Sequence, residues 1–289
     1  MNKAHIYRQR RAAHSMPLQP KYRFLIRYLV SVAVILTVIV VTAAFARADG
    51  DERQSLPDGI ATSLLEVEIP DETPEIIAEY TGFKVSFNPS RHLPNYVAWE
   101  LTGTETEGDE PRRSRFAVDN NVLGCATLDD YRNSGFDRGH MAPAADMKWN
   151  TQAMADCHFL TNICPQDHGL NGGRWNALEQ ACRRWAKRDS AIIIIAGPVL
   201  SDRMTRSIGR SRVSVPERFF KVIFAPYVDQ PRAIAFVMPN SNTREPLESM
   251  AMSVDQLEEI IGFDFFSTLH DSLENDIERH FNYHKWTAR

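Results

Sequence analysis

Runs of apolar and β-branched residues are separated by polar segments along most of the chain, and they predict both strands and helices. The strand-like runs cover residues 84–87, 96–101, 191–196, 219–224 and 233–238. Apolar residues recur instead at helical spacing over residues 175–187 and 254–261, and Ser253 stands where the second helix needs its cap. The combination of strands and helices predicts an α+β fold.

The N-terminal 48 residues follow a different pattern, in which a basic flank precedes an apolar run. This run spans residues 28–46, a length of 19 residues, and no acidic residue precedes Asp49. About 20 apolar residues cross a bilayer, and a cationic flank stays in the cytoplasm. We therefore expect residues 1–48 to form a signal anchor, or a cleaved signal peptide, that places the rest of the chain in the periplasm or outside the cell. An arginine-rich start without acidic residues is also typical of a mitochondrial presequence, which keeps the intermembrane space open as an alternative.

The rest of the chain is acidic. Residues 49–75 contain acidic residues and proline and are expected to form a linker, followed by one domain over residues 76–289. Residues 1–48 hold 8 of the 33 Lys and Arg residues and none of the 37 acidic residues, so the remainder carries a formal charge of −12. Such a domain gains no long-range attraction for a polyanion, and binding one would require a local basic surface. Candidates for that surface are Arg112, Arg113, Arg115, Arg138, Arg174 and Arg183.

Residues suited to catalysis are concentrated between positions 137 and 183. An Asp-Arg-Gly-His segment at 137–140 is followed by Asn162, Asn171 and Glu179. His140 suits proton abstraction from water, because the pKa of imidazole lies near neutral pH. Asn171 offers a neutral oxygen, which binds a hard cation such as Mg²⁺ without cancelling its charge. These groups are the ones needed to hydrolyse a phosphodiester with a single metal ion.

A helix that begins near Asn171 would bring three of these side chains together, since an amide is a preferred N-cap. Glu179 would follow about two turns later and Arg183 one turn after that, and at roughly 100° per residue all three would point broadly the same way. Glu179 could then hold a metal-bound water. Arg183 could bind a phosphate oxygen through its planar guanidinium.

These motifs resemble the DNA/RNA non-specific endonuclease family of ββα-metal (His-Me finger) nucleases, over roughly residues 75–270. The segments that support the resemblance further are 80–83, 96–99, 130–136 and 219–223. The resemblance implies a central antiparallel sheet, a general base at His140 and a metal ligand at Asn171, with Mg²⁺ or alternatively Mn²⁺ as the cofactor. It also implies that Glu179 contacts the metal through water, and that Asn162 and Arg183 support the active site.

The sequence departs from the family pattern at one position and is ambiguous at another. Gly172 stands where the family often has glutamine after the metal-binding asparagine. The upstream catalytic arginine aligns with Arg112, Arg113 or Arg115, of which Arg113 is favoured. Arg138, in the Asp-Arg-Gly-His segment, is a further catalytic candidate. The expected substrate-binding residues are therefore Arg113, Arg138 and Arg183.

The cysteines allow a different interpretation. The chain has four, at Cys125, Cys157, Cys164 and Cys182. Cys157 and His158 could join Cys164 and His168 in a zinc cluster, but their spacing matches no compact Cys-x₂₋₄-Cys pattern. Four cysteines in an exported domain fit one or two disulfides better, although the pairing cannot be read from the sequence. Unpaired buried thiols stay open as a third interpretation.

We therefore expect an exported or membrane-anchored, metal-dependent endonuclease that cuts DNA or RNA with little regard to sequence and leaves 5′-phosphate ends. Contacts to the nucleic-acid backbone carry no base information. The expected partners are nucleic acid, the membrane through residues 28–46 and, as an open alternative, a second copy of the chain. Two rival hypotheses are a phosphodiesterase for smaller nucleotides and a degenerate domain kept for binding at the cell surface. Intact His140, Asn171 and Glu179 argue against the second.

Overall fold

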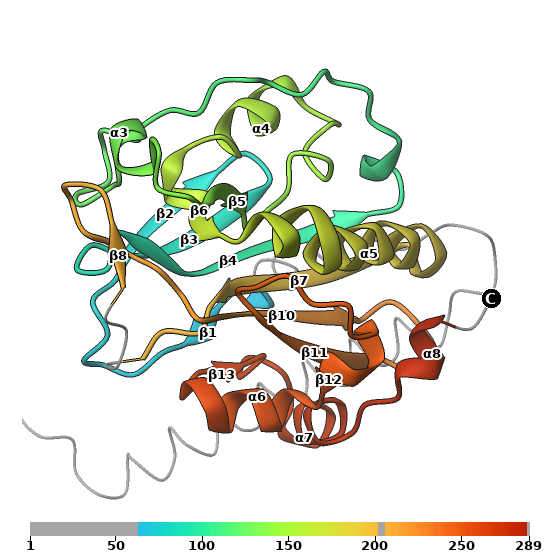
Figure 1. Ribbon diagram of the computed structural model, residues 1–289. Coiled ribbons are helices and arrows are strands. Elements are labelled where there is room, and N and C mark those ends of the chain that lie inside the picture. The colour runs from blue at the N-terminus through green and yellow to red at the C-terminus, as the bar shows by residue number, and fades with distance from the viewer. Residues whose placement is uncertain (1–62, 202–205, 288–289) are drawn as a thin grey trace, which may run out of the picture. The chain divides into compact units, whose positions relative to one another are not determined.

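A seven-stranded antiparallel sheet runs through the computed structural model, which describes residues 63–201 and 206–287 (Figure 1). The strand order is β12-β11-β10-β7-β4-β3-β2. The bounds are β2 Ile76–Tyr80, β3 Phe83–Asn88, β4 Leu93–Thr102, β7 Ala191–Pro198, β10 Arg218–Ala225, β11 Arg232–Pro239 and β12 Ala251–Met252. Each of the five predicted strands lies within one of these. The α+β class and the central antiparallel sheet are thus confirmed.

Among the described residues, three pairs of short strands and six α-helices accompany the central sheet. The pairs are β1 Val67–Glu68 with β13 Asp264–Phe265, β5 Asp137–His140 with β6 Ile163–Gln166, and β8 Ser207–Ile208 with β9 Val213–Ser214. The helices are α3 Leu128–Tyr131, α4 Thr151–Asp156, α5 Asn176–Asp189, α6 Val254–Ile261, α7 Asp271–Arg279 and α8 Tyr283–Thr287. Helix α6 has the predicted bounds, and the Ser253 hydroxyl accepts a hydrogen bond from the Gln256 backbone at its start.

Both faces of the central sheet are covered, which explains why its strands read as uninterrupted apolar runs. In β7, Ile192 and Ile194 belong to one apolar core, whereas Ile193 and Ile195 belong to the other. Helices α4 and α5 and the β5–β6 pair lie on the first side of the sheet, and α6 and α7 lie on the second (Figure 1). Because side chains alternate along a strand, the odd-numbered residues of β10 share the side that carries α5 and the β5–β6 pair.

The folded domain begins before the predicted boundary at residue 76. Val67 pairs with Phe265 between β1 and β13, and both Leu64 and Val67 are buried. Residues 63–75 therefore belong to the folded domain, because their apolar side chains fill the core under α6. The predicted anchor over residues 1–48 lies outside the described residues. Within 63–201 and 206–287, no helix is long and apolar enough to cross a membrane.

Candidate active site

The predicted site residues lie on β5, directly before β6, in the segment that leads into α5 and on α5 itself, whereas Arg113 lies in an irregular segment before β5. Strands β5 and β6 pair antiparallel, so that His140 lies opposite Ile163 and Arg138 opposite Pro165. Residues 170–175 then lead into α5, which completes a strand-strand-helix unit. Gly139 allows the two strands to approach, because a Cβ at this position would lie 2.2 Å from Oε1 of the buried Gln166.

Asn162 fixes the backbone that follows His140. Its side-chain oxygen accepts a hydrogen bond from the Ala142 amide over 2.9 Å, and its amide nitrogen donates to the carbonyls of Ala142 (2.9 Å) and Cys157 (2.8 Å). The Trp175 indole donates to the His140 carbonyl over 3.2 Å. Asn162 is buried and these bonds occupy its side chain, so it positions the neighbouring segment and is not directed at substrate.

The His140 imidazole is buried and uncharged near neutral pH. Its ring is only 6% exposed and packs against Phe116 and His158, with ring centroids 5.2 and 5.1 Å away. Burial, the neighbouring His158, and the positive charges of Arg112 and Arg138 lower the pKa of His140 to about 3. Nε2 has no hydrogen-bond partner among the described residues. An uncharged imidazole of this kind can accept a proton.

Asn171 is oriented by a carboxylate on β5. Its amide nitrogen donates to Oδ2 of Asp137 over 2.9 Å, and Nδ1 of the exposed His168 lies 2.9 Å from the same oxygen. The bond to Asp137 uses the amide nitrogen and turns the carbonyl oxygen of Asn171 away from that carboxylate. This neutral oxygen is a suitable ligand for a hard cation.

The prediction that Asn171 caps a regular helix is wrong. Asn171 lies inside an irregular segment, Leu170–Trp175, in which Gly173 has non-helical angles of φ −104° and ψ −109°. Helix α5 begins only at Asn176. Two consecutive glycines, Gly172 and Gly173, favour such a break, because they weaken helix propensity at that point. Asn171 is therefore placed by its bond to Asp137 and not by the register of α5.

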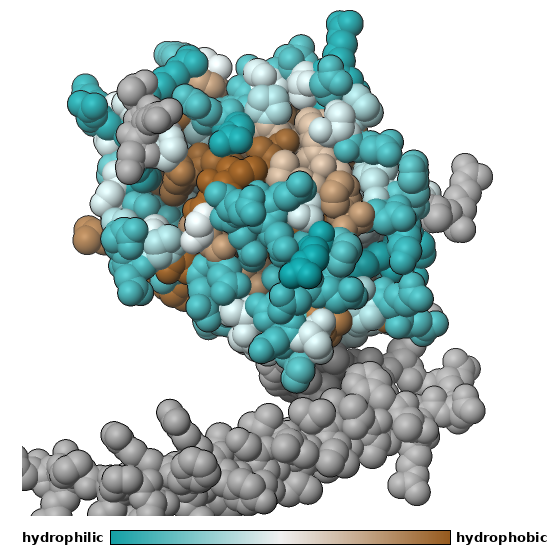
Figure 2. All heavy atoms as spheres, turned by 90° about the horizontal axis from the view of Figure 1, so that it is seen from below, coloured by the Kyte–Doolittle hydropathy of each residue, from teal (hydrophilic) through white to brown (hydrophobic). Residues whose placement is uncertain are grey.

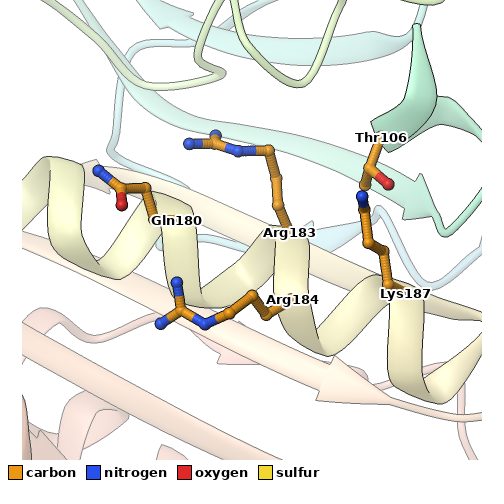
Figure 3. Close-up of a pocket in the computed structure, with 5 residues that line it drawn as sticks. All are labelled: Thr106, Gln180, Arg183, Arg184 and Lys187. Atoms are coloured by element: carbon orange, nitrogen blue, oxygen red, sulfur yellow. The ribbon is translucent and has the colours of Figure 1, made fainter.

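Glu179 and Arg183 lie one turn apart on α5 among buried charges. Arg183 Nη1 donates to Oδ1 of the buried Asp146 over 2.7 Å, and the Trp99 indole donates to Oδ2 over 3.3 Å. Burial raises the pKa of Glu179 to about 7, although the charges of Lys221 and Arg183 oppose this shift. Figure 3 shows Arg183 extending from α5 in a different direction from Arg184, beside a hollow of about 280 Å³.

A larger hollow of about 570 Å³ lies at the exposed side of β5. Its lining includes Asp137, Arg138 and Asn171 together with Arg112 and Phe116. The Arg138 guanidinium stacks over the Phe116 ring, 4.4 Å from its centroid. Two arginines and the oriented amide of Asn171 thus face one cavity, a suitable arrangement for a phosphate and a cation.

The lining of this hollow includes Arg112 and not the favoured Arg113. Arg112 also contributes to the lowered pKa of His140, whereas Arg113 acts on His158, partly through its backbone. All three upstream arginines, Arg112, Arg113 and Arg115, are exposed. Sequence spacing could not separate them, because they precede Phe116 in an irregular segment.

Sequence reasoning missed Lys221 and Asp146 and considered His158 only as a zinc ligand. Lys221 is 1% exposed, and its ammonium group lies 4.4 Å from the Trp175 ring centroid and 5.3 Å from that of Trp99. A single lysine within the apolar run 219–224 could have indicated a functional role for Lys221, because an unpartnered charge is costly in a buried strand. Asp146 and His158 carry no comparable signal, since they lie in irregular segments.

The expected disulfides are absent from the described residues, where all four cysteines are free thiols. Cys157 donates from Sγ to the Met154 carbonyl over 3.4 Å, and its sulfur lies 3.3 Å from Nδ1 of His158. Cys164 and Cys182 are also buried, and Cys125 is partly buried. The zinc hypothesis named the wrong group, because Cys157 and His158 lie with His140, within 4.8 Å of one another, and not with Cys164 and His168.

Comparison with known proteins identifies relatives over most of the described chain. A family model described as DNA/RNA non-specific endonuclease matches residues 61–272. The chain is 35% identical over 215 residues to "Nuclease EXOG, mitochondrial" of Danio rerio, covering 68% of this chain and 63% of that protein. It is 32% identical over 242 residues to "Nuclease 1, mitochondrial" of Schizosaccharomyces pombe, covering 76% and 74% of the two chains.

Human "Endonuclease G, mitochondrial" is 32% identical over 199 residues, which cover 64% of this chain and 67% of that protein. Against the EXOG relatives of zebrafish, Xenopus laevis, mouse and human, the chain spans only 56 to 63% of their length. A solved structure, titled as the EndoG/EndoGI complex and a mechanism of EndoG inhibition, superimposes with a TM-score of 0.65 at 25% identity. The match covers 76% of this chain and 96% of that one.

Proposed function

The chain belongs to the DNA/RNA non-specific endonuclease family, and we propose that it is a nuclease that cuts phosphodiester bonds inside the strand with His140 as the general base. The observation that carries this proposal is the uncharged imidazole of His140 on the strand that also supplies Asp137, the carboxylate that orients Asn171. A base and an oriented neutral oxygen on one strand-strand-helix unit suit the activation of water beside a bound cation.

The residues present fit a hard divalent cation. Asn171 supplies a neutral carbonyl oxygen, and the Glu179 carboxylate can hold a metal-bound water. Oxygen ligands of this kind suit Mg²⁺ or Mn²⁺ better than zinc. Such an ion, when bound, would neutralise charge on the phosphate and on the leaving oxygen. Asp137 would act indirectly, by keeping the Asn171 oxygen directed toward the ion.

His140 would remove the proton from the attacking water. Its low pKa keeps the ring unprotonated across the neutral range, and Asn162 and Trp175 hold the strand that carries it. An attack in line with the 3′ oxygen would leave a 5′-phosphate on the product. Lys221 and Arg183 would support the ionised form of Glu179, because their positive charges lower its pKa against the effect of burial.

Substrate recognition would rest on arginines around the larger hollow. Arg112 and Arg138 line this hollow, whereas Arg183 lines the smaller hollow and pairs with Asp146. We assign the upstream catalytic arginine to Arg112 and keep Arg113 as the variant against which it is tested. Guanidinium groups that bind phosphates carry no information about base identity, which supports cleavage with little regard to sequence.

Two rival functions are a phosphodiesterase for smaller nucleotides and a degenerate binding domain. A phosphodiesterase for smaller nucleotides would use the same base and cation. A degenerate binding domain is disfavoured by membership of a nuclease family and by the retained His140, Asn171 and Glu179.

Several relatives are named as mitochondrial proteins, which favours the intermembrane-space alternative. Export, membrane anchoring and pairing with a second copy stay predictions.

The test uses the full-length chain with supercoiled plasmid and with single-stranded RNA, each with and without EDTA. We expect nicking and then fragmentation of both substrates, loss of activity in EDTA, and recovery with Mg²⁺. End-labelling should find 5′-phosphates. Activity that survives exhaustive chelation, or that is restricted to mononucleotide esters, would contradict the proposal.

A further inference from the structure

Five carboxylates converge where α6, β13 and α7 meet, on the side of the central sheet away from His140 and Asn171 (Figure 1). They are Asp255 and Glu258 on α6, Asp264 on β13, and Glu274 and Glu278 on α7. The molecule as seen from this side in Figure 2 shows hydrophilic side chains around a central apolar area. The functional proposal above gives these carboxylates no role.

Glu278 is the common member of two groups of three. Carboxylate oxygens of Asp255, Glu258 and Glu278 lie within 4.8 Å of one another, and so do those of Asp264, Glu274 and Glu278. Glu278 is only 5% exposed, and its Oε1 is buried with no hydrogen-bond partner among the described residues. An acceptor buried in this way is costly unless something binds it.

The described part of the protein supplies no positive charge to this group. None of the five carboxylates forms an ion pair with a described residue. The Phe265 backbone amide donates to Oε1 of Glu258 over 2.8 Å. Burial and the neighbouring carboxylates raise the pKa of Glu278 to about 9, and burial is also the main cause that raises the pKa of Glu258 to about 7. Without a bound cation, burial and the repulsion between the carboxylates keep Glu278 protonated near neutral pH.

We propose that these five carboxylates form a Ca²⁺ site centred on Glu278. Calcium takes six to eight oxygen ligands at about 2.3–2.6 Å, so oxygens on opposite sides of the ion are separated by at most roughly 5 Å. Within each group of three, the carboxylate oxygens lie within 4.8 Å of one another, close enough to share an ion. Magnesium usually keeps several waters and binds through one or two carboxylates, whereas calcium accepts more carboxylate oxygens, so this concentration of carboxylates favours calcium. Asp264 is exposed and leaves a route for the ion and its waters.

The bound ion would hold the C-terminal layer onto the sheet. It would join α6 to α7 and to β13, and β13 also pairs with β1 through Phe265 and Val67. This layer covers the second apolar core, which contains Leu257, Phe266 and Ile277. The site would thus stabilise the fold and would be separate from the catalytic cation at Asn171.

Thermal unfolding of the full-length chain tests the proposal. After removal of metals with EDTA, CaCl₂ should raise the unfolding temperature by roughly 5 °C at a hundredfold excess over its dissociation constant, and MgCl₂ at the same ionic strength should raise it less. Glu278→Gln should abolish the calcium increment. Glu259→Gln alters an exposed carboxylate of α6 outside the group and should keep the full increment.

Calorimetric titration separates this site from the catalytic one. The wild type should bind one Ca²⁺ at the carboxylates, and Asn171→Ala should retain that ion. Glu274→Gln, a change at a less buried member of the group, provides a second variant if Glu278→Gln does not fold. Cleavage in Mg²⁺ below the unfolding temperature should not change in either glutamine variant. The proposal is overturned if calcium leaves the wild type unchanged, if Glu278→Gln and Glu274→Gln keep the increment, or if Asn171→Ala removes the bound ion.

Discussion

The Asn171 amide nitrogen donates to Oδ2 of Asp137 over 2.9 Å, so a residue at the start of β5 sets the orientation of a residue that follows β6. The two are 34 positions apart in the sequence. Under the proposed function, Asp137 would contribute to metal binding without being a ligand. Residues that orient metal ligands typically change metal affinity or activity by about 10–100-fold when they are removed.

Asp137→Ala should raise the Mg²⁺ concentration needed for half-maximal cleavage by about 10–100-fold. The maximal rate should largely return at high Mg²⁺, because the Asn171 oxygen itself is kept. The measurement is a Mg²⁺ titration of plasmid cleavage. Asp129→Ala removes an exposed carboxylate of α3 paired with Arg132 and should leave the titration unchanged. A loss that no Mg²⁺ concentration restores would show that Asp137 has another role.

His140→Ala should lower the turnover rate by about 10²–10⁴-fold, the usual contribution of a general base. Its neighbour His158 provides a matched control, because both rings are buried and pack against Phe116. His158→Phe should keep most of the activity, since His158 touches His140 but has no proposed part in proton transfer. Single-turnover rates with saturating Mg²⁺ separate the two variants. Equal losses in both would assign the effect to packing.

The pH dependence should follow Glu179 and not His140. An imidazole with an unshifted pKa near 6.5 would lose roughly tenfold in active form per pH unit below that value. The pKa of His140 is lowered to about 3, so the ring stays unprotonated from pH 7 to 5. Glu179 has a pKa raised to about 7 and becomes protonated on acidification in the absence of metal.

Cleavage should therefore decrease below about pH 7 at low Mg²⁺. Raising Mg²⁺ should move that decrease to lower pH, because a cation held beside Glu179 through water favours the ionised carboxylate. The measurement is a set of rate profiles between pH 5 and 8 at several Mg²⁺ concentrations. Glu179→Gln should be slower overall and should lack the decrease. A decrease that persists in Glu179→Gln would return His140 to consideration as the titrating group.

The long strands could be predicted because both faces of the sheet are covered. β7 and β10 bury nearly every side chain, so they read as apolar runs. Strands β5 and β6 carry the site but are only four residues each and mix polar with apolar residues. Their existence was implied only by the Asp-Arg-Gly-His motif and the family resemblance, since no periodicity develops over four residues.

Long-range partners of the site could not be predicted. The sequence indicates His140, Asn171 and Glu179, but not that Asp137 would bind Asn171 or that Asp146 would bind Arg183, because these pairs form only when separate elements pack together. Asparagine is a preferred helix cap, but the two glycines that follow Asn171 disfavour a regular helix there, and Gly173 has non-helical angles. The prediction of disulfides depended on an oxidising compartment, whereas cysteines are also common as buried free thiols.

Stability in EDTA should fall as pH rises from about 5 to 9. The folded-state pKa of Glu278 is raised to about 9, above its ordinary value of 4.5, by burial and by the carboxylates of Glu258, Glu274, Asp264 and Asp255. Such a group contributes stability that is fully present below pH 4.5 and is lost as pH rises through 9. The slope is at most about 1.4 kcal/mol per pH unit for one proton.

Urea unfolding across this pH range measures the effect. Glu278→Gln should flatten the dependence, because an amide has no proton to lose, and the exposed-site variant Glu259→Gln should not. A wild-type stability that rises between pH 5 and 9 in EDTA would contradict the raised pKa, whatever the outcome with calcium.

The last prediction concerns the arginine that binds phosphate. Arg112 lines the same hollow as Arg138 and Asn171, whereas Arg113 does not. Arg112→Ala should therefore reduce cleavage of unrelated DNA and RNA sequences by similar factors, because guanidinium-phosphate contacts do not read bases. Arg113→Ala, the adjacent exposed variant, should have a smaller effect. Both substitutions remove one positive charge, so they alter the net charge of the protein equally.

Binding across a salt series distinguishes a direct phosphate contact from a general loss of charge. The logarithm of affinity falls with the logarithm of salt concentration at a slope of about −0.9 per phosphate contact on duplex DNA. Arg112→Ala should make this slope shallower by roughly one contact, measured with EDTA present so that no cleavage occurs. Residues 49–289 carry a formal charge of −12, so the wild-type slope should reflect only a few contacts. An unchanged slope in Arg112→Ala together with a shallower one in Arg113→Ala would reverse the assignment.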